Sequence, residues 1–189
     1  DTLKRNLSEE NGMYQNLLLK VHNLANVTDV NTRHTKIETL MNVIIDNVSK
    51  TYSRVSGLEL EVKRLSSELD EQKKEAMEMK AEGNALYKEG KYEEACAKYT
   101  AGLRVCPISA SKDRSVLYAN RAQMKKVMGQ LEEGIRNCTK SIELNPMYVS
   151  ALLRRAKALE ALGQYERARN DATFVLQIDP QSKAAKKLV

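Results

Sequence analysis

One interval recurs three times in the second half of the chain and constrains its fold more than any other feature. Gly90, Gly129 and Gly163 are each followed by a proline at the same spacing, and the sequence contains only these three prolines. The step from Gly129 to Gly163 matches a repeat of about 34 residues, whereas the step from Gly90 to Gly129 is slightly longer. A repeat of this length, with a glycine at its centre and a proline at its end, predicts a solenoid of stacked helix pairs.

The intervals share one numbering when each proline is given position 32. The repeats then occupy residues 76–109, 115–148 and 149–182, and a capping helix begins within 183–189. Each repeat is predicted to hold two helices, A and B, that meet at the glycine. Small residues recur at positions 8 and 20, where they let the two helices approach closely: Gly83, Ala122 and Ala156, then Ala95, Gly134 and Ala168. A short insertion, 110–114, accounts for the longer first interval.

Residues 1–75 carry a different pattern. From Ile37 to Met79, apolar residues follow one another at alternating steps of four and three, and only Thr51 and Gln72 interrupt the series. Apolar residues at this spacing, with charged residues between them, predict a coiled coil. We refer to this series as the seam. A single long surface helix is the less favoured alternative, because its apolar stripe would need a partner to cover it.

A second, shorter series of apolar residues precedes the seam and includes Leu3, Leu7 and Tyr14. Residues 26–34, between the two series, are rich in side chains that cap helices or compete with them. Thr35 and Glu38 then have the spacing of a capping box, which predicts that the long helix begins there. This arrangement fits either a helical hairpin or an extended parallel dimer.

Taken together, these patterns predict an all-α chain with two parts. Residues 1–75 form a coiled-coil oligomerisation region, and residues 76–189 form a three-repeat helical solenoid. The chain does not begin with methionine and ends just inside a predicted helix, so we expect it to be a fragment.

The charge of the chain is concentrated in the repeats. Of the formal net charge of +6, residues 1–75 contribute −1 and residues 76–189 contribute +7. An acidic peptide fits this positive helical surface better than nucleic acid does, since no aromatic side chains alternate with the basic ones to stack on bases. The three cysteines show no CxxC spacing, which indicates reduced thiols and a cytoplasmic location. No apolar run approaches the length of a membrane span.

The sequence gives no sign of catalysis. A glycine-rich phosphate loop, a carboxylate pair and a nucleophile–histidine arrangement are all absent from it. His22 and His34 are well separated in the sequence and have no acidic or cysteine companions at ligand spacing. We therefore predict that the protein is not an enzyme and holds no cofactor and no metal.

The concave face of the solenoid offers the candidate binding residues. On an A helix, positions 5 and 9 lie one turn apart on the same face, as do positions 2 and 6. These inward positions hold Lys80 and Asn84 in the first repeat, Asn120 in the second, and Ser150 and Arg154 in the third. Cations and amide donors around one groove predict an anion site.

Three stretches around these residues resemble a known family: Lys80-Ala-Glu-Gly-Asn84, Leu117-Tyr-Ala-Asn120-Arg-Ala and Leu153-Arg154-Arg-Ala. They are similar to the carboxylate-clamp tetratricopeptide repeats (TPRs) of co-chaperones, the family of the Hsp-organising protein and tetratricopeptide repeat protein 1. The resemblance implies a groove that holds the acidic Glu-Glu-Val-Asp tail of heat-shock chaperones. Lys80, Asn84 and Asn120 would bind the terminal carboxylates, and Arg154 would add charge along the peptide. The family usually has a lysine where this chain has Ser150.

The function that follows is a non-enzymatic adaptor, a co-chaperone that binds chaperone tails through a partial clamp and self-associates through its coiled coil. One alternative is a structural scaffold in which the coiled coil carries the function and the groove binds a different partner. Nucleic-acid binding by the positive repeats is a third and less favoured class.

Overall fold

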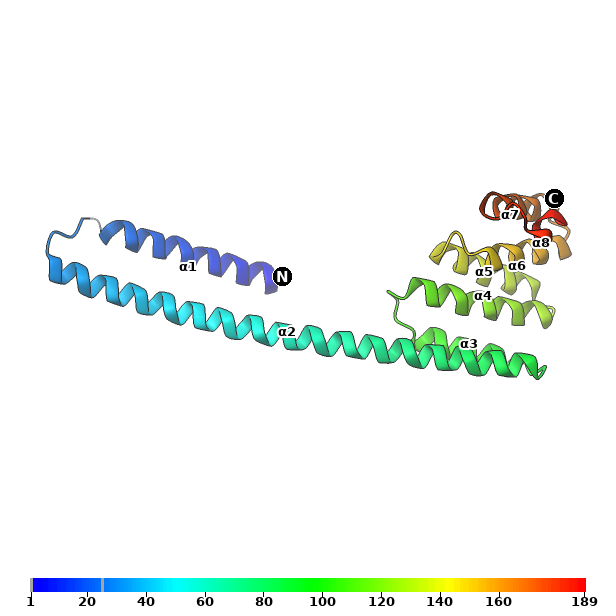
Figure 1. Cartoon of the computed structure of the whole chain (residues 1–189), viewed down its shortest axis with the longest axis horizontal. Helices are drawn as coiled ribbons and strands as arrows, with labels where there is room; N and C mark the ends of the chain where they lie inside the picture. The colour runs from blue at the N-terminus through cyan, green and yellow to red at the C-terminus, as the bar shows by residue number, and fades with distance from the viewer. Residues whose placement is uncertain (1, 25) are drawn as a thin grey trace. The chain divides into compact units, whose positions relative to one another are not determined.

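The computed structural model describes residues 2–24 and 26–189, with side chains from residue 11 onward in these ranges. Its helices are α1 (Thr2–Leu24), α2 (Val30–Lys88), α3 (Tyr92–Val105), α4 (Ser111–Val127), α5 (Leu131–Leu144), α6 (Val149–Ala161), α7 (Tyr165–Ile178) and α8 (Lys183–Lys186) (Figure 1). No strand occurs in the described ranges, so the all-α prediction is confirmed for them. The chain divides into two compact units, Asp1–Arg64 and Leu65–Val189, and α2 contributes to both.

The second unit is a series of helix pairs joined by glycine turns. Gly90, Gly129 and Gly163 have φ values of 79°, 75° and 72°, a left-handed conformation that glycine adopts without steric cost. At the first turn, Lys91 N–H donates to the Leu86 carbonyl over 3.0 Å, which closes a Schellman motif, and the other two turns repeat this bond. The interval between glycine and proline therefore corresponds to a B helix, which stops just before the proline because proline disfavours a helical residue in front of it.

Small residues let the helices of each pair pack closely. A Cβ atom on Gly83 would lie 2.7 Å from Cε1 of Tyr99, so only glycine at this point of α2 leaves room for the ring on α3. Tyr99 is in turn buried in the core formed by α2, α3 and α4. The small residues at positions 8 and 20 of all three repeats are buried.

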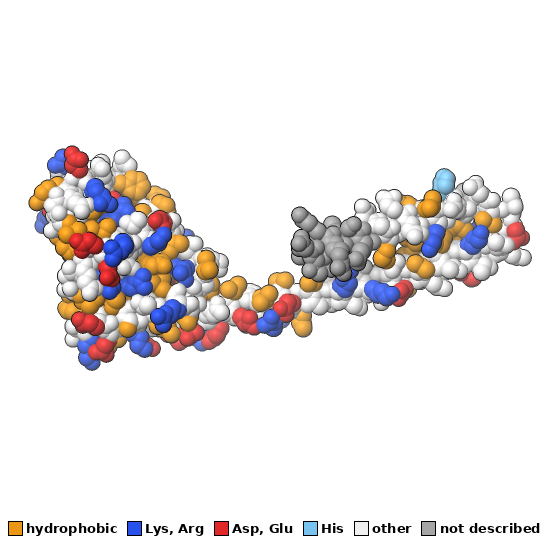
Figure 2. Space-filling model, turned by 180° about the vertical axis from the view of Figure 1, so that it is seen from behind, with side chains coloured by type: hydrophobic (Ala, Val, Ile, Leu, Met, Phe, Trp, Pro, Cys, Tyr) orange, Lys and Arg blue, Asp and Glu red, His pale blue; other side chains and the backbone are white. Residues whose placement is uncertain are grey.

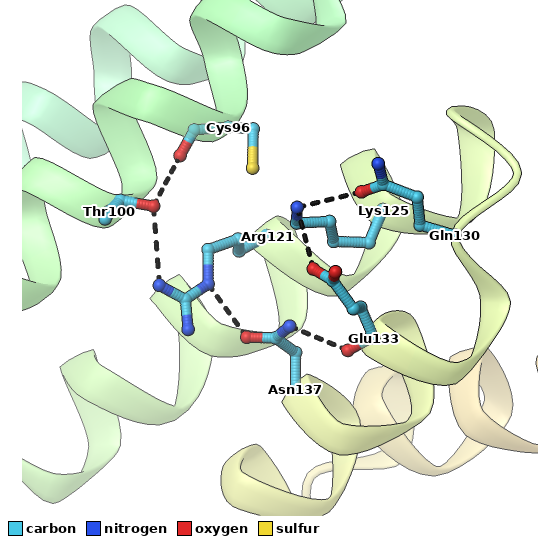
Figure 3. A network of polar contacts seen from close by, with 7 residues as sticks. All are labelled: Cys96, Thr100, Arg121, Lys125, Gln130, Glu133 and Asn137. Atoms are coloured by element: carbon cyan, nitrogen blue, oxygen red, sulfur yellow. Dashed lines mark hydrogen bonds and ion pairs between the residues drawn. The ribbon is translucent and has the colours of Figure 1, made fainter.

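In the second and third repeats, an arginine at position 7 joins the A helix to its own B helix and to the B helix of the repeat before it. Nε of Arg121, at position 7, donates to Oδ1 of Asn137 over 2.8 Å, while its Nη1 donates to Oγ1 of Thr100 on the preceding B helix over 3.3 Å (Figure 3). One repeat later, Arg155 makes the same connections to Asp171 and Thr139. These hydrogen bonds hold successive repeats together and so set the spacing between their A helices.

The chain ends in a short segment that packs on the third repeat. Ala185 of α8 is fully buried, and the side chain of Leu188 packs against the apolar clusters of α6 and α7. This segment, residues 183–188, is thereby held against the end of the solenoid.

The first unit contains α1 and the beginning of α2, which run antiparallel as a hairpin (Figure 1). Apolar side chains of both helices, among them Tyr14, Leu17, Ile44 and Val48, line a cavity of about 390 Å³ between them. The side chains of Leu3 and Leu7 lie outside those that the structure describes. The coiled coil stays a prediction, since the seam of α2 is largely exposed, as the hydrophobic side chains at the surface of this helix show (Figure 2).

The predicted start of the long helix was wrong by more than one turn. The helix begins at Val30, because Oδ2 of Asp29 accepts a hydrogen bond from Thr32 N–H over 2.7 Å and another from the Thr32 hydroxyl. These hydrogen bonds from Thr32 also lower the pKa of Asp29. The Thr35 hydroxyl instead donates to the Asn31 carbonyl inside the helix, over 3.1 Å.

Among the described residues, no helix is both long enough and apolar enough to cross a membrane. Within the same ranges, no group of histidine, cysteine, aspartate or glutamate residues could hold a metal ion. The three cysteines are free, and burial raises the pKa of Cys138 to about 12, so this thiol stays protonated.

Candidate peptide-binding groove

The five predicted site residues lie on the three A helices of the second unit. Lys80 and Asn84 are one turn apart on α2, Asn120 is on α4, and Ser150 and Arg154 are one turn apart on α6. Lys80, Asn120 and Arg154 are half-buried, whereas Asn84 and Ser150 are exposed. We call the surface formed by these five residues the groove.

Three of the five residues are joined in one hydrogen-bonded chain across the repeats. Nη1 of Arg154 donates to Oδ1 of Asn120 over 3.0 Å, and Nδ2 of Asn120 donates to Oδ1 of Asn84 over 3.4 Å. The same Asn84 oxygen accepts a hydrogen bond from the Tyr99 hydroxyl over 2.8 Å. The structure thus brings Asn84, Asn120 and Arg154 together. Lys80 and Ser150 make no hydrogen bond or ion pair within the described part of the chain, and each lies one turn from a member of this series.

The direction of these hydrogen bonds determines what the groove offers to a ligand. Both side-chain amide oxygens, those of Asn84 and Asn120, already accept bonds from protein donors. Apart from the Ser150 hydroxyl and a second lone pair on the Asn120 oxygen, the polar capacity that remains consists of donors: amide N–H groups, the Arg154 guanidinium and the Lys80 ammonium. A surface on which donors and two cations outnumber the acceptors suits a carboxylate, since charge-assisted bonds to anions are the stronger class.

Tyr99 is the one residue of this arrangement that the sequence interpretation missed. Its ring belongs to the core, while its hydroxyl reaches the groove and fixes which way the Asn84 amide points. Burial raises the pKa of Tyr99, so the hydroxyl is protonated at neutral pH and acts as the donor. The sequence does contain a hint of this contact, because phenylalanine would fill the same core position and a buried tyrosine hydroxyl usually has a hydrogen-bond partner.

The Tyr99 hydroxyl can be tested by removing it alone. We expect Tyr99→Phe to weaken binding of a tail peptide with a free C-terminal carboxylate by about three- to tenfold, the effect of one hydrogen bond of roughly 0.5–1.5 kcal/mol. Binding of the same peptide with an amidated C-terminus should change less than twofold. Fluorescence anisotropy with both peptides measures this. Equal losses for the two peptides would show that Tyr99 supports the fold and not the orientation of Asn84.

Known proteins match about three-fifths of the chain. The second TPR domain of human RPAP3, solved in complex with the HSP70 peptide SGPTIEEVD, is 32% identical with a TM-score of 0.55 and covers 64% of this chain and 93% of that chain. The first TPR of Spaghetti (RPAP3), bound to the HSP90 peptide SRMEEVD, is 31% identical with a TM-score of 0.57 and covers 61% of this chain and 87% of that chain. The chain belongs to the TPR family.

Curated relatives extend the same match. The mitochondrial import receptor subunit TOM70 of Homo sapiens is 42% identical over 100 residues, which are 53% of this chain and 16% of the receptor. The chain therefore spans less than a fifth of the length of that relative. No protein-family model matches the chain. The solved TPR domains include those of co-chaperones, so the predicted resemblance to TPR co-chaperones is confirmed, and the TPR unit is an interaction module and not an enzyme.

Proposed function

We propose that the TPR unit binds the acidic C-terminal tail of a heat-shock chaperone. Lys80, Asn84 and Asn120 hold the terminal carboxylates, and Arg154 pairs with a carboxylate that precedes them. The observation that carries this proposal is the hydrogen-bonded chain across three repeats, which leaves donors and cations facing the groove. The two similar TPR domains described above support it, because their chaperone peptides both end in Glu-Glu-Val-Asp.

The expected affinity is micromolar. A hydrogen bond to a charged group contributes roughly 1.5–3 kcal/mol, and several of them offset the entropy lost on association. A Kd of 1 μM corresponds to about −8.2 kcal/mol. Ser150 brings no charge to a position where the family usually has a lysine, so the affinity should lie below that of a site with all five clamp residues.

Titration of the chain with a labelled peptide that ends in Met-Glu-Glu-Val-Asp tests the proposal. We expect micromolar binding that weakens as salt rises from about 50 to about 500 mM, since charge pairs are screened over about 10 Å at 0.1 M. The control is a peptide with the same residues in scrambled order. Equal affinity for the two peptides would contradict the proposal, because it would mean that the groove attracts any acidic peptide through its positive charge.

The proposed adaptor also self-associates through its N-terminal part, and we place it in the cytoplasm. Four apolar side chains of the seam are 46–66% exposed in the single chain: Leu58, Val62, Leu65 and Leu69. A row of large apolar side chains this exposed usually marks a surface that binds a partner. In the first unit, the apolar cavity of about 390 Å³ also leaves room for side chains from another molecule, because protein interiors are normally close-packed.

The three free cysteines support a cytoplasmic location, because thiols stay reduced in that compartment.

Two charges in the seam should abolish this self-association. We expect the wild type to be a dimer and Leu65→Lys with Leu69→Lys to be a monomer, because lysine ammonium groups cannot be buried between helices without a partner. Light scattering coupled to gel filtration measures the mass. The control, Ser66→Lys with Ser67→Lys, adds the same charges off the seam and should stay dimeric. A monomeric wild type would contradict the proposed self-association, whereas a dimer that ignores the tail peptide would favour the scaffold alternative.

A further inference from the structure

A cavity lined by lysines lies at the C-terminal end of the TPR unit. Its volume is about 810 Å³, and its lining includes Lys126 of α4, Lys157 of α6, and Lys183 and Lys187 of the C-terminal segment. Glu160 is the one acidic residue of the lining, and Leu188 forms an apolar part of the wall. We call this site the lysine cavity.

The four lysines have no carboxylate partners in the described part of the chain, unlike three other lysines of the TPR unit. Lys98, Lys125 and Lys140 each form an ion pair with a glutamate. The four cavity lysines form none, and together with Glu160 they leave a net charge of +3 around one hollow. Like charges in a concave site raise the local potential and attract an anionic ligand.

The lysine cavity shares its helices with the groove. Lys157 follows Arg154 by three residues on α6, so the two side chains are neighbours on the helix surface. Lys126 lies on α4, the helix that carries Asn120, and α4 contacts α6 directly. The groove and the lysine cavity are therefore adjacent parts of one surface.

The order of the A helices sets the direction in which a bound tail would run. If the terminal carboxylates lie at Lys80 and Asn84 on α2, and an earlier carboxylate lies at Arg154 on α6, the chain before the tail continues away from α2. The C-terminal segment packs against α6 and α7, and its Lys183 and Lys187 line the same cavity as Lys157 of α6. The burial of Ala185 and the packing of Leu188 hold this segment against α6 and α7, so its two lysines stay close to Lys157.

We propose that the lysine cavity is a second binding site, which takes an acidic segment that precedes the tail in the same chaperone polypeptide. This inference rests on the proposed function of the groove. A peptide is the expected ligand because the lining contains no aromatic side chain on which a nucleic-acid base could stack, and because the apolar wall at Leu188 suits a side chain next to the carboxylates.

Two tail peptides test the proposal. Both end in Met-Glu-Glu-Val-Asp, and the six residues before this end alternate either Gly and Ser or Asp and Glu. We expect the wild type to bind the acidic peptide about tenfold more tightly, because several partly exposed charge pairs each add a small increment. In Lys157→Glu with Lys187→Glu, the ratio of the two affinities should fall to within twofold of one, while the Gly-Ser peptide still binds.

A matched variant controls for net charge. Lys36→Glu with Lys112→Glu changes the charge by the same amount at exposed positions outside the lysine cavity, and it should keep the tenfold ratio. The proposal is overturned if the cavity variant keeps the ratio or if the control variant loses it. It is also overturned if a single-stranded DNA oligonucleotide binds the wild type more tightly than the acidic peptide and loses this binding in the cavity variant.

The same peptides separate this inference from the proposed function. A wild type that ignores amidation of the Gly-Ser peptide refutes the groove assignment and, with it, the direction on which the lysine cavity depends. A wild type that requires the free carboxylate but shows no preference for the acidic peptide refutes the lysine cavity alone.

Discussion

Lys80→Ala and Asn84→Ala should each weaken binding of a Glu-Glu-Val-Asp peptide by about 30-fold, which corresponds to roughly 2 kcal/mol. Either change removes a donor that we propose binds the terminal carboxylate, and a hydrogen bond to an anion contributes more than one between neutral groups. Asn84→Asp should have a larger effect. The new side chain keeps an oxygen that accepts from Tyr99 and Asn120, but it replaces the amide N–H donors with a negative charge that repels the peptide carboxylate.

Isothermal titration calorimetry of these variants measures the loss. Lys112→Ala is the control, because Lys112 is an exposed lysine outside the groove, and its removal should change the affinity by less than twofold. If the Lys80→Ala variant binds the peptide as tightly as the Lys112→Ala control does, Lys80 is not part of the binding site.

Asp171→Ala should lower the free energy of unfolding of the TPR unit by roughly 3 kcal/mol. Arg155 donates to both Asp171 oxygens over 2.8 Å and 2.7 Å, and the two side chains are only 21% and 10% exposed. The hydrogen bond to Asp171 raises the pKa of Arg155. Arginine is effectively always protonated in proteins even without such a partner, so the guanidinium keeps its charge after the carboxylate is removed. A largely buried cation without its anion is then left between two repeats.

Urea unfolding followed by circular dichroism gives this difference. Asn137→Ala is the matched comparison, because Asn137 occupies the same position one repeat earlier and meets Arg121 with a neutral amide. It should cost roughly 1.5 kcal/mol, the lower end of the range for a hydrogen bond with one charged partner. If both variants unfold at the same urea concentration, the charge of the Arg155–Asp171 pair adds nothing to repeat stacking.

The repeat architecture was predictable from the sequence because its turns depend on residues with few substitutes. A left-handed turn position favours glycine strongly, and a proline ends the helix before it, so the interval between Gly129 and Pro146 marks a B helix without any structural information. The positions of Asn84, Asn120 and Arg154 on A helices followed from the same numbering.

The details of the groove were less accessible because they depend on how helices pack. Tyr99 was interpretable only as a core residue until the structure showed its hydroxyl at the Asn84 amide. The lysine cavity depends on the placement of residues 183–188 against α6, which no sequence periodicity encodes. Asp29 replaced Thr35 at the start of α2 because competing capping residues a few positions apart are hard to rank from sequence. The seam indicates that an apolar partner is needed, but not which one.

The most direct test of the central claim compares two peptides that differ by one functional group. Calorimetric titration of the wild-type chain with Ser-Arg-Met-Glu-Glu-Val-Asp as a free acid should give a micromolar Kd, and amidation of the C-terminus should weaken binding at least 30-fold, because it removes one of the carboxylates that Lys80, Asn84 and Asn120 are proposed to hold. Equal affinity for the free acid and the amide would contradict the account.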